Sequence, residues 1–152
     1  MDIFQICIKH QNPILVKELS IMLIEDDAIE VMKLHRALKK HPVKHNVIEA
    51  GNGEQALEML KDEGQLPDVI FLDLNMPKMN GIEFLTTLKN DSLIKYIPTV
   101  ILTTSANLND VKTCYEIGIA GYIIKPLKYE EYIERILKTV DYWAVNQLYK
   151  PL

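Results

Sequence analysis

The residue best placed to do chemistry in this chain is Asp73, a carboxylate that follows the apolar run 69–72 and precedes a loop rich in Pro and Gly. A short apolar run of this kind is typical of a strand buried on both faces of a parallel sheet. Because a lone ionised carboxylate is costly to bury, Asp73 should lie at the carboxyl end of that strand, where open α/β sheets bind ligands. An Asp in this position can also do no more than begin a turn, so Asp73 alone leaves both interpretations open.

A second acidic patch follows another apolar run, residues 19–24, and consists of Glu25, Asp26 and Asp27. Clustered like charges repel one another unless a cation compensates them. Oxygen-rich acidic clusters suit Mg²⁺, with Mn²⁺ as an alternative. Asp27 directly precedes a helical pattern and is expected to cap that helix, but capping does not account for all of these acids. The two acidic strand ends together therefore predict a divalent metal site.

Two more polar side chains fall at the ends of predicted strands. Thr103 ends the run 98–103, and Lys125 follows the run 122–124. A carboxylate such as Asp73 can attack phosphorus and form an acyl phosphate. Such a transfer depends mainly on positioning and on neutralisation of charge, which Mg²⁺ and the Lys125 ammonium would supply.

Apolar strands alternate with amphipathic helical segments along the chain, and this alternation must position the polar residues. Five strand-helix repeats predict an α/β fold with a parallel sheet, helices on both faces and right-handed crossovers. The flavodoxin-like strand order 2-1-3-4-5 makes the first and third strands neighbours, so that their acids meet at one switch point. The predicted strands are 19–24, 43–50, 69–72, 98–103 and 122–124, and the predicted helices are 28–40, 54–62, 82–88, 107–117 and 129–148.

The first predicted helix and the residues after it carry three of the histidines. Residues Val31, Leu34, His35 and Leu38 keep the spacing of a stripe that faces the core. His41 and His45 are also close in the sequence, but Pro42 lies between them and breaks any helix that would align them. Metal binding by His41 and His45 is therefore not expected.

Length, composition and charge exclude several other classes of protein. The 152 residues, 48% hydrophobic and 25% charged, are typical of one globular domain. A net charge of −4 with scattered Lys and Arg argues against a nucleic-acid-binding surface. No apolar run approaches the roughly 20 residues of a membrane span, and no secretory signal is found, so a cytoplasmic location is expected. Cys7 and Cys114 are expected to be free thiols.

Over roughly residues 19–140 the chain resembles a response-regulator receiver domain of a two-component system. The resemblance rests on Glu25 and Asp26, Asp73, the loop 75–81, Thr103 and the segment 121–126. It implies that Asp73 accepts a phosphoryl group from a sensor histidine kinase or hybrid kinase, in a signalling domain that is not an enzyme beyond slow self-dephosphorylation. It also implies that Mg²⁺ is bound by Asp26 and Asp73, by Glu25 through water, and by the backbone carbonyl of Asn75.

The resemblance further implies a switch. Thr103 would bond one phosphoryl oxygen, Lys125 would pair with another, and Tyr122 would turn inward. This change would remodel the face made by helix 107–117, strand 122–124 and the last helix, for a downstream protein, a phosphotransfer protein or a homodimer partner. Alternatively, Tyr122 is a half-buried strand tyrosine without a switching role.

Three other residues have structural roles at the site by the same resemblance. Pro77 and Gly81 would shape the loop that follows Asp73. The Lys125–Pro126 peptide resembles the family's cis junction, although cis is the minority state of an X-Pro bond.

The chain ends lie outside the predicted receiver domain, which spans 19–148. Residues 1–18 form an N-terminal extension that is expected to be flexible, and 149–152 form a short tail with no output domain after it. Tyr142, Trp143 and the tail are similar to those of stand-alone regulators that serve phytochrome-type and hybrid kinases, some of which dimerise. Trp143 could belong to a partner surface or to the core.

Two other classes share part of this pattern. A Mg²⁺ phosphatase of the haloacid dehalogenase type would use Asp73 as a turnover nucleophile, but such enzymes have a second Asp where this chain has Asn75. A flavin-binding module would need a Gly-rich phosphate loop after the first strand, where the acids 25–27 would repel a phosphate. A receiver that acts without phosphorylation is the remaining alternative.

Overall fold

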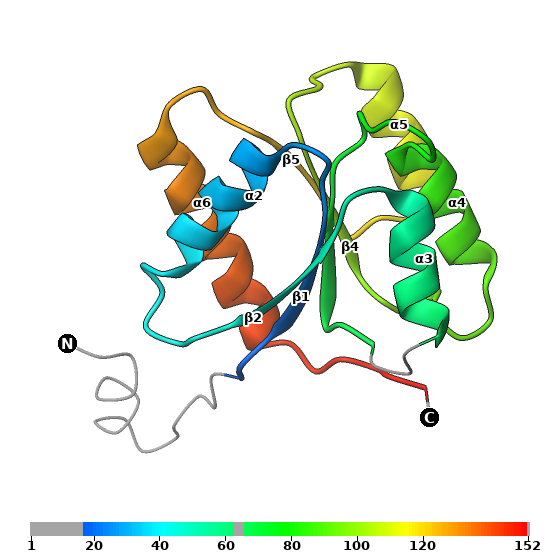
Figure 1. Cartoon of the computed structure of the whole chain (residues 1–152), viewed down its shortest axis with the longest axis horizontal. Helices are drawn as coiled ribbons and strands as arrows, with labels where there is room; N and C mark the ends of the chain where they lie inside the picture. Colours follow the sequence, from blue (N-terminus) through cyan, green and yellow to red (C-terminus); the bar gives the residue numbers. More distant parts are fainter. Residues whose placement is uncertain (1–16, 63–65, 152) are drawn as a thin grey trace.

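The computed structural model describes residues 17–62 and 66–151, and its five parallel strands form one sheet in the order β2-β1-β3-β4-β5 (Figure 1). The strands are β1 (Ser20–Ile24), β2 (Asn46–Ala50), β3 (Val69–Leu72), β4 (Thr99–Thr103) and β5 (Gly121–Ile124). The helices are α2 (Ala28–Leu38), α3 (Gly53–Asp62), α4 (Gly81–Asn90), α5 (Leu108–Ile117) and α6 (Tyr129–Ala144). The predicted α/β fold and its strand order are confirmed.

The helices cover both faces of the sheet. Figure 1 shows α2 and α6 on one side and α3, α4 and α5 on the other. Each side encloses its own apolar cluster: Leu34, Phe71 and Ile136 belong to the first, and Leu72 and Phe84 to the second. Because both faces are covered, the central strands contain apolar residues at consecutive positions rather than at alternate ones.

Strands β1 and β3 lie side by side at the centre of the sheet. Their register pairs Ile24 with Leu72, the last residue of each strand. The ladder continues for one more step, because the Asp73 N–H donates to the Ile24 carbonyl at 3.1 Å. The residues that follow, Glu25 and Asp73, therefore leave the sheet at the same edge.

The last helix is shorter than the sequence predicted. It ends at Ala144 instead of reaching residue 148. The side-chain amide of Asn146 donates to the Tyr142 carbonyl at 2.6 Å. This side chain therefore takes the place of the backbone N–H that would continue the helix. Beyond it, Tyr149 packs edge-on against Tyr96 with ring centroids 4.8 Å apart. The chain therefore turns away from the helix axis and crosses the amino ends of the strands (Figure 1).

The expected core position of His35 is wrong, whereas Leu34 and Leu38 are buried as predicted. The His35 side chain is 41% exposed and its Nε2 lies 2.5 Å from Glu49 on β2. His35 lies at the border of the buried stripe of α2, so its polar side chain turns to a surface partner. Strand β2 also begins later than predicted, at Asn46, because residues 41–45 form a turn.

Several expectations concern residues outside the described ranges. These include most of the N-terminal extension, Cys7 and Leu152. Cys114 is a buried free thiol on α5, as predicted. Within the described residues, none of the helices combines the length and apolar character that crossing a membrane requires.

Candidate functional site

Glu25, Asp26 and Asp73 meet at the carboxyl ends of β1 and β3. One carboxylate oxygen from each lies within 4.8 Å of the others. Glu25 and Asp73 are buried, with 6% and 8% exposure, whereas Asp26 faces solvent. The sequence therefore predicted correctly which acids share an edge of the sheet, and no other group of three potential metal ligands is found in residues 17–62 and 66–151.

Burial raises the pKa of both inner acids. For Glu25 the burial outweighs the hydrogen bond and charge of Lys125, and the Asp73 carboxylate raises the pKa further. For Asp73 burial again dominates, while the nearby Lys125 charge opposes it. The carboxylates at this edge outnumber the buried cation, and a bound divalent cation would relieve that excess of negative charge.

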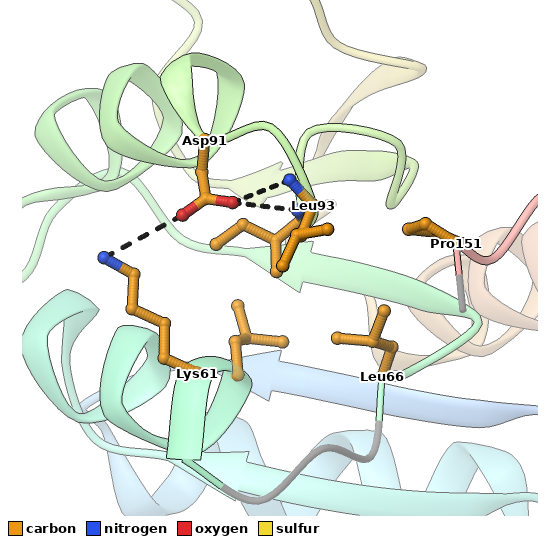
Figure 2. A pocket seen from close by; sticks show the side chains of 7 residues that line it. Lys61, Leu66, Asp91, Leu93 and Pro151 are labelled. Atoms are coloured by element: carbon orange, nitrogen blue, oxygen red, sulfur yellow. Dashed lines mark hydrogen bonds and ion pairs between the residues drawn. The ribbon is translucent and has the colours of Figure 1, made fainter.

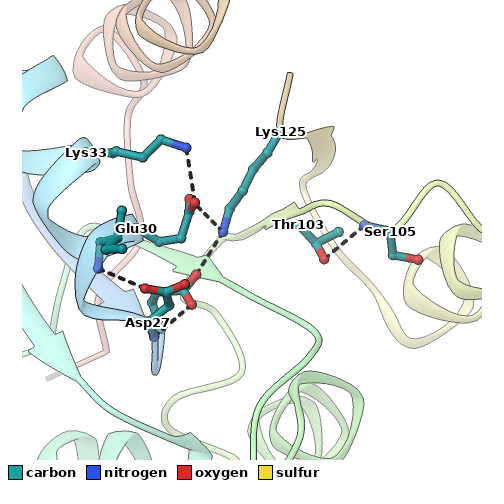
Figure 3. Close-up of polar contacts among 8 residues, drawn as sticks. Asp27, Glu30, Lys33, Thr103, Ser105 and Lys125 are labelled. Atoms are coloured by element: carbon teal, nitrogen blue, oxygen red, sulfur yellow. Dashed lines mark hydrogen bonds and ion pairs between the residues drawn. The ribbon is translucent and has the colours of Figure 1, made fainter. Parts of the chain in front are cut away.

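The buried cation is Lys125, at the end of β5. The backbone N–H of Lys125 donates to the Thr103 carbonyl at 2.8 Å. This bond extends the β4–β5 ladder and directs the Lys125 side chain toward the acids. Its Nζ lies 2.9 Å from a Glu25 carboxylate oxygen and 3.2 Å from one of Glu30 (Figure 3). Burial alone would lower the pKa of Lys125, but the Glu25, Asp73 and Glu30 carboxylates together raise it. Lys125 is therefore held as an ammonium.

Glu30 is a site residue that the sequence does not single out. It lies in the first turn of α2, where an acidic residue usually reflects nothing more than the helix dipole. Only the fold, which brings the end of β5 over this turn, makes it a second carboxylate partner of Lys125. No signal in the sequence distinguishes it from other acids near helix starts.

Ser105 links Thr103 and Tyr122 through hydrogen bonds of its backbone. The Thr103 hydroxyl is buried at the end of β4 and accepts a hydrogen bond from the Ser105 N–H at 3.3 Å (Figure 3). The Tyr122 hydroxyl donates to the Ser105 carbonyl at 2.9 Å. The Ser105 hydroxyl donates in turn to Asp110 on α5, at 2.7 Å. Tyr122 is partly buried against the apolar cluster, and this burial raises its pKa.

The loop after Asp73 is shaped by close backbone packing. A Cβ atom at Gly81 would lie 2.5 Å from the Asp73 carbonyl oxygen, so only glycine fits there. The next element is fixed by Asn80, which caps α4 by accepting from the Glu83 N–H at 3.0 Å. Asn75 and Pro77 lie between them on the exposed part of the loop.

The cis junction implied at Lys125–Pro126 is not found, because none of the peptide bonds in the described residues is cis. The trans form of an X-Pro bond is favoured by roughly 0.5–1 kcal/mol in the absence of other constraints. Lys125 reaches Glu25 with this trans junction.

His41 and His45 lie together in the turn before β2, although Pro42 prevents a helix there. The His45 Nε2 is 3.2 Å from the His41 Nδ1, and the His41 Nε2 is 2.6 Å from Asp141 on α6. The Leu19 N–H donates to the His45 Nδ1 at 2.9 Å. Burial lowers the pKa of His45. Their ring nitrogens are thus engaged in hydrogen bonds that link Leu19, just before β1, to the turn and to α6.

A separate cavity of about 300 Å³ lies near the amino end of β3, away from the acids. Figure 2 shows Leu66, Leu93 and Pro151 around it, with Lys61 4.0 Å from Asp91 at its rim. None of the residues predicted for the functional site lines this cavity. Apart from this Lys61–Asp91 pair, the residues that line the cavity are apolar.

The sequence of this chain is similar to those of known proteins. The family model described as the response regulator receiver domain matches residues 21–137. The response regulator Rcp1 of Synechocystis sp. is 31% identical over 128 residues, which cover 81% of this chain and 87% of that protein.

Solved structures of response regulators share the fold of this chain. The phosphorylated cyanobacterial phytochrome response regulator RcpA has a TM-score of 0.82 at 30% identity, covering 87% of this chain and 99% of that one. The Mn²⁺-bound form of Rcp1 has a TM-score of 0.78 at 29% identity, covering 88% of this chain and 99% of that one.

Proposed function

The chain belongs to the response regulator receiver domain family of two-component signalling, and we propose that it accepts a phosphoryl group from a histidine kinase on Asp73. Receiver domains receive phosphoryl groups from histidine kinases and act on downstream partners. The observation that carries the proposal is the meeting of the Asp73, Glu25 and Asp26 carboxylates within 4.8 Å at the edge where Lys125 and Thr103 also end their strands.

In the proposed transfer, an oxygen of the Asp73 carboxylate attacks the phosphorus of a phosphohistidine. A P–O bond to Asp73 forms, the P–N bond breaks, and its electron pair stays on the departing imidazole nitrogen. The Lys125 ammonium would neutralise charge on the phosphoryl oxygens, and the Thr103 hydroxyl would donate to one of them. Asp73 is fixed for attack because its backbone is hydrogen-bonded to β1 and packed against Gly81.

The residues at this edge fit a divalent metal ion. Their donor set is made of carboxylate oxygens, which Mg²⁺ and Mn²⁺ prefer, and burial without full charge compensation raises the pKa of Glu25 and Asp73. We assign Asp26 and Asp73, with Glu25 and the backbone carbonyl of Asn75, as the groups that would hold it. When bound, the ion would offset the negative charge of the phosphoryl group.

The proposed output is a change at the face formed by α5, β5 and α6. Thr103 and Tyr122 are joined through the backbone of Ser105, so a Thr103 hydroxyl drawn to a phosphoryl oxygen would pull on the bond that orients Tyr122. Beside Tyr122, a cavity of about 380 Å³ is lined by Ile124, Arg135 and Lys138 among others. A downstream protein, a phosphotransfer protein or a second copy of the chain would read this face.

Acetyl phosphate, a small phosphoryl donor, provides the test. With Mg²⁺, the wild type should gain the mass of one phosphoryl group, and Asp73→Asn should gain none. Asp62→Asn, which neutralises an exposed acid at the end of α3, is the matched control and should react like the wild type. Equal labelling of Asp73→Asn would contradict the proposal, and rapid turnover of small phosphate esters would favour the phosphatase alternative.

A further inference from the structure

The ammonium of Lys125 is shared by two carboxylates that come from different elements. Glu25 follows β1 and lies 2.9 Å away, and Glu30 in α2 lies 3.2 Å away (Figure 3). Among the residues the structure describes, Asp73 makes no ion pair with Lys125 within 4.0 Å, so the ammonium is held on the α2 side of the site. Glu25 is one of the groups proposed to help to hold the metal ion, whereas Glu30 has no such role.

The two oxygens of Glu30 differ in their surroundings. Its Oε1 is 3.1 Å from the Lys33 ammonium, which also lies 4.8 Å above the Tyr132 ring. Its Oε2 is buried and has no hydrogen-bond donor, although the Lys125 Nζ is 3.2 Å away. The contact with Lys125 is therefore an ion pair without an aligned N–H, and the buried oxygen depends on this attraction.

We propose that Glu30 is a positioning residue that restrains Lys125, drawing its ammonium toward α2 and so weakening its pairing with a phosphoryl group on Asp73. This inference rests on the proposed function. When Lys125 turns to a phosphoryl oxygen, the Oε2 of Glu30 loses its nearest cation while remaining buried. The contact with Lys33 continues to offset part of the charge of the Glu30 carboxylate, so Lys125 can leave Glu30.

Beryllofluoride, which mimics a phosphoryl group on a carboxylate, gives the first test. With saturating Mg²⁺, calorimetric titration should show that Glu30→Gln binds beryllofluoride roughly threefold to tenfold more tightly than the wild type. Glu134→Gln is the matched control, since Glu134 forms an exposed helical ion pair with Lys138 on α6, and its affinity should equal that of the wild type. Unchanged or weaker binding by Glu30→Gln overturns the restraint.

A double-mutant cycle separates the action through Lys125 from a general change in charge. In the unliganded protein, Glu30→Gln and Lys125→Gln should be non-additive in chemical unfolding, with about a threefold to tenfold interaction in the unfolding equilibrium constant. Additive effects would contradict the contact even if no beryllofluoride binding were measurable in the Lys125 variant. A wild type that binds no beryllofluoride would instead contradict the proposed function, whereas a wild type that binds it as tightly as Glu30→Gln would contradict this inference alone.

Discussion

The Tyr122 hydroxyl donates a 2.9 Å hydrogen bond to the Ser105 carbonyl, which joins the start of β5 to the loop after β4. The same Ser105 donates its N–H to the Thr103 hydroxyl. Thr103 is expected to contact the phosphoryl group, and Tyr122 lies on the proposed output face. A single residue, Ser105, links the two by hydrogen bonds. This relation gives the proposed switch a physical route.

Tyr122→Phe should leave phosphorylation of Asp73 intact and loosen the loop that contains Ser105. The lost bond is partly exposed, so we expect a loss of about 1 kcal/mol or less in the free energy of unfolding. Urea denaturation measures this loss, and amide hydrogen exchange should rise at residues 104–107. Tyr115→Phe, at an exposed position on α5, is the control. Unchanged exchange in this loop would show that the hydroxyl does not order it.

Gly81→Ala should destabilise the fold and displace the Asp73 backbone. The added Cβ would lie 2.5 Å from the Asp73 carbonyl oxygen and 2.8 Å from the Leu74 Cα, and neither is the end of a flexible side chain. Overpacking of this kind costs about 1–3 kcal/mol. Gly51→Ala is the matched control, because its Cβ would meet only the Gln55 side chain at 3.4 Å. Thermal unfolding of the two variants should differ, and equal midpoints would contradict the close approach.

Asp68 should make stability depend on acidic pH. Burial alone would raise its pKa, but Lys150, the Ser20 N–H and Lys17 together lower it. The unfolded chain therefore binds the proton more readily, so this stabilisation is present above the ordinary Asp pKa and is lost as the pH falls through the lowered one.

Denaturant unfolding between about pH 6 and pH 3 measures this loss. The wild type should lose more stability over this range than Asp68→Asn, which is expected to be about 1–3 kcal/mol less stable near neutral pH. Lys150→Gln should have a smaller effect, since the Lys150 side chain is 41% exposed. Parallel pH profiles for the wild type and Asp68→Asn would contradict the role of Asp68.

Mg²⁺ should raise the thermal unfolding midpoint of the wild type, because a ligand that binds only the folded state stabilises it. Asp26→Asn should have nearly wild-type stability without Mg²⁺, since Asp26 is exposed, and should lose most of the Mg²⁺-dependent increase. Differential scanning calorimetry with and without Mg²⁺ makes the comparison. An equal increase in the variant would place the metal elsewhere.

The convergence of four polar residues could be predicted because each ends or directly follows an apolar run that the sequence marks as a strand: Glu25, Asp73, Thr103 and Lys125. Parallel strands in one sheet have their carboxyl ends at the same edge. The position of each residue at the end of its strand was therefore enough to predict that these residues meet. The residue types of the acids are what predict a metal site and a phosphoacceptor at this edge. The strand order then made β1 and β3 neighbours.

Other contacts depend on tertiary packing that local patterns do not encode. Glu30 pairs with Lys125 across 95 positions of the chain, and His41 meets Asp141 across 100. The end of α6 at Ala144 follows from an Asn146 side-chain bond, which competes with continued helix and which apolar periodicity cannot reveal. His35 kept the helical spacing but lies at the border of the buried stripe.

The most direct test of the account identifies the residue that carries the phosphoryl group. After reaction with acetyl phosphate and Mg²⁺, borohydride reduces an acyl phosphate on an aspartate to homoserine, and peptide mass spectrometry locates it. If Asp73 carries the phosphoryl group, homoserine is found at position 73 and the peptides containing Glu25 and Asp26 are unmodified. Reduction at another residue, or Mg²⁺-dependent labelling that leaves Asp73 unchanged, would contradict it.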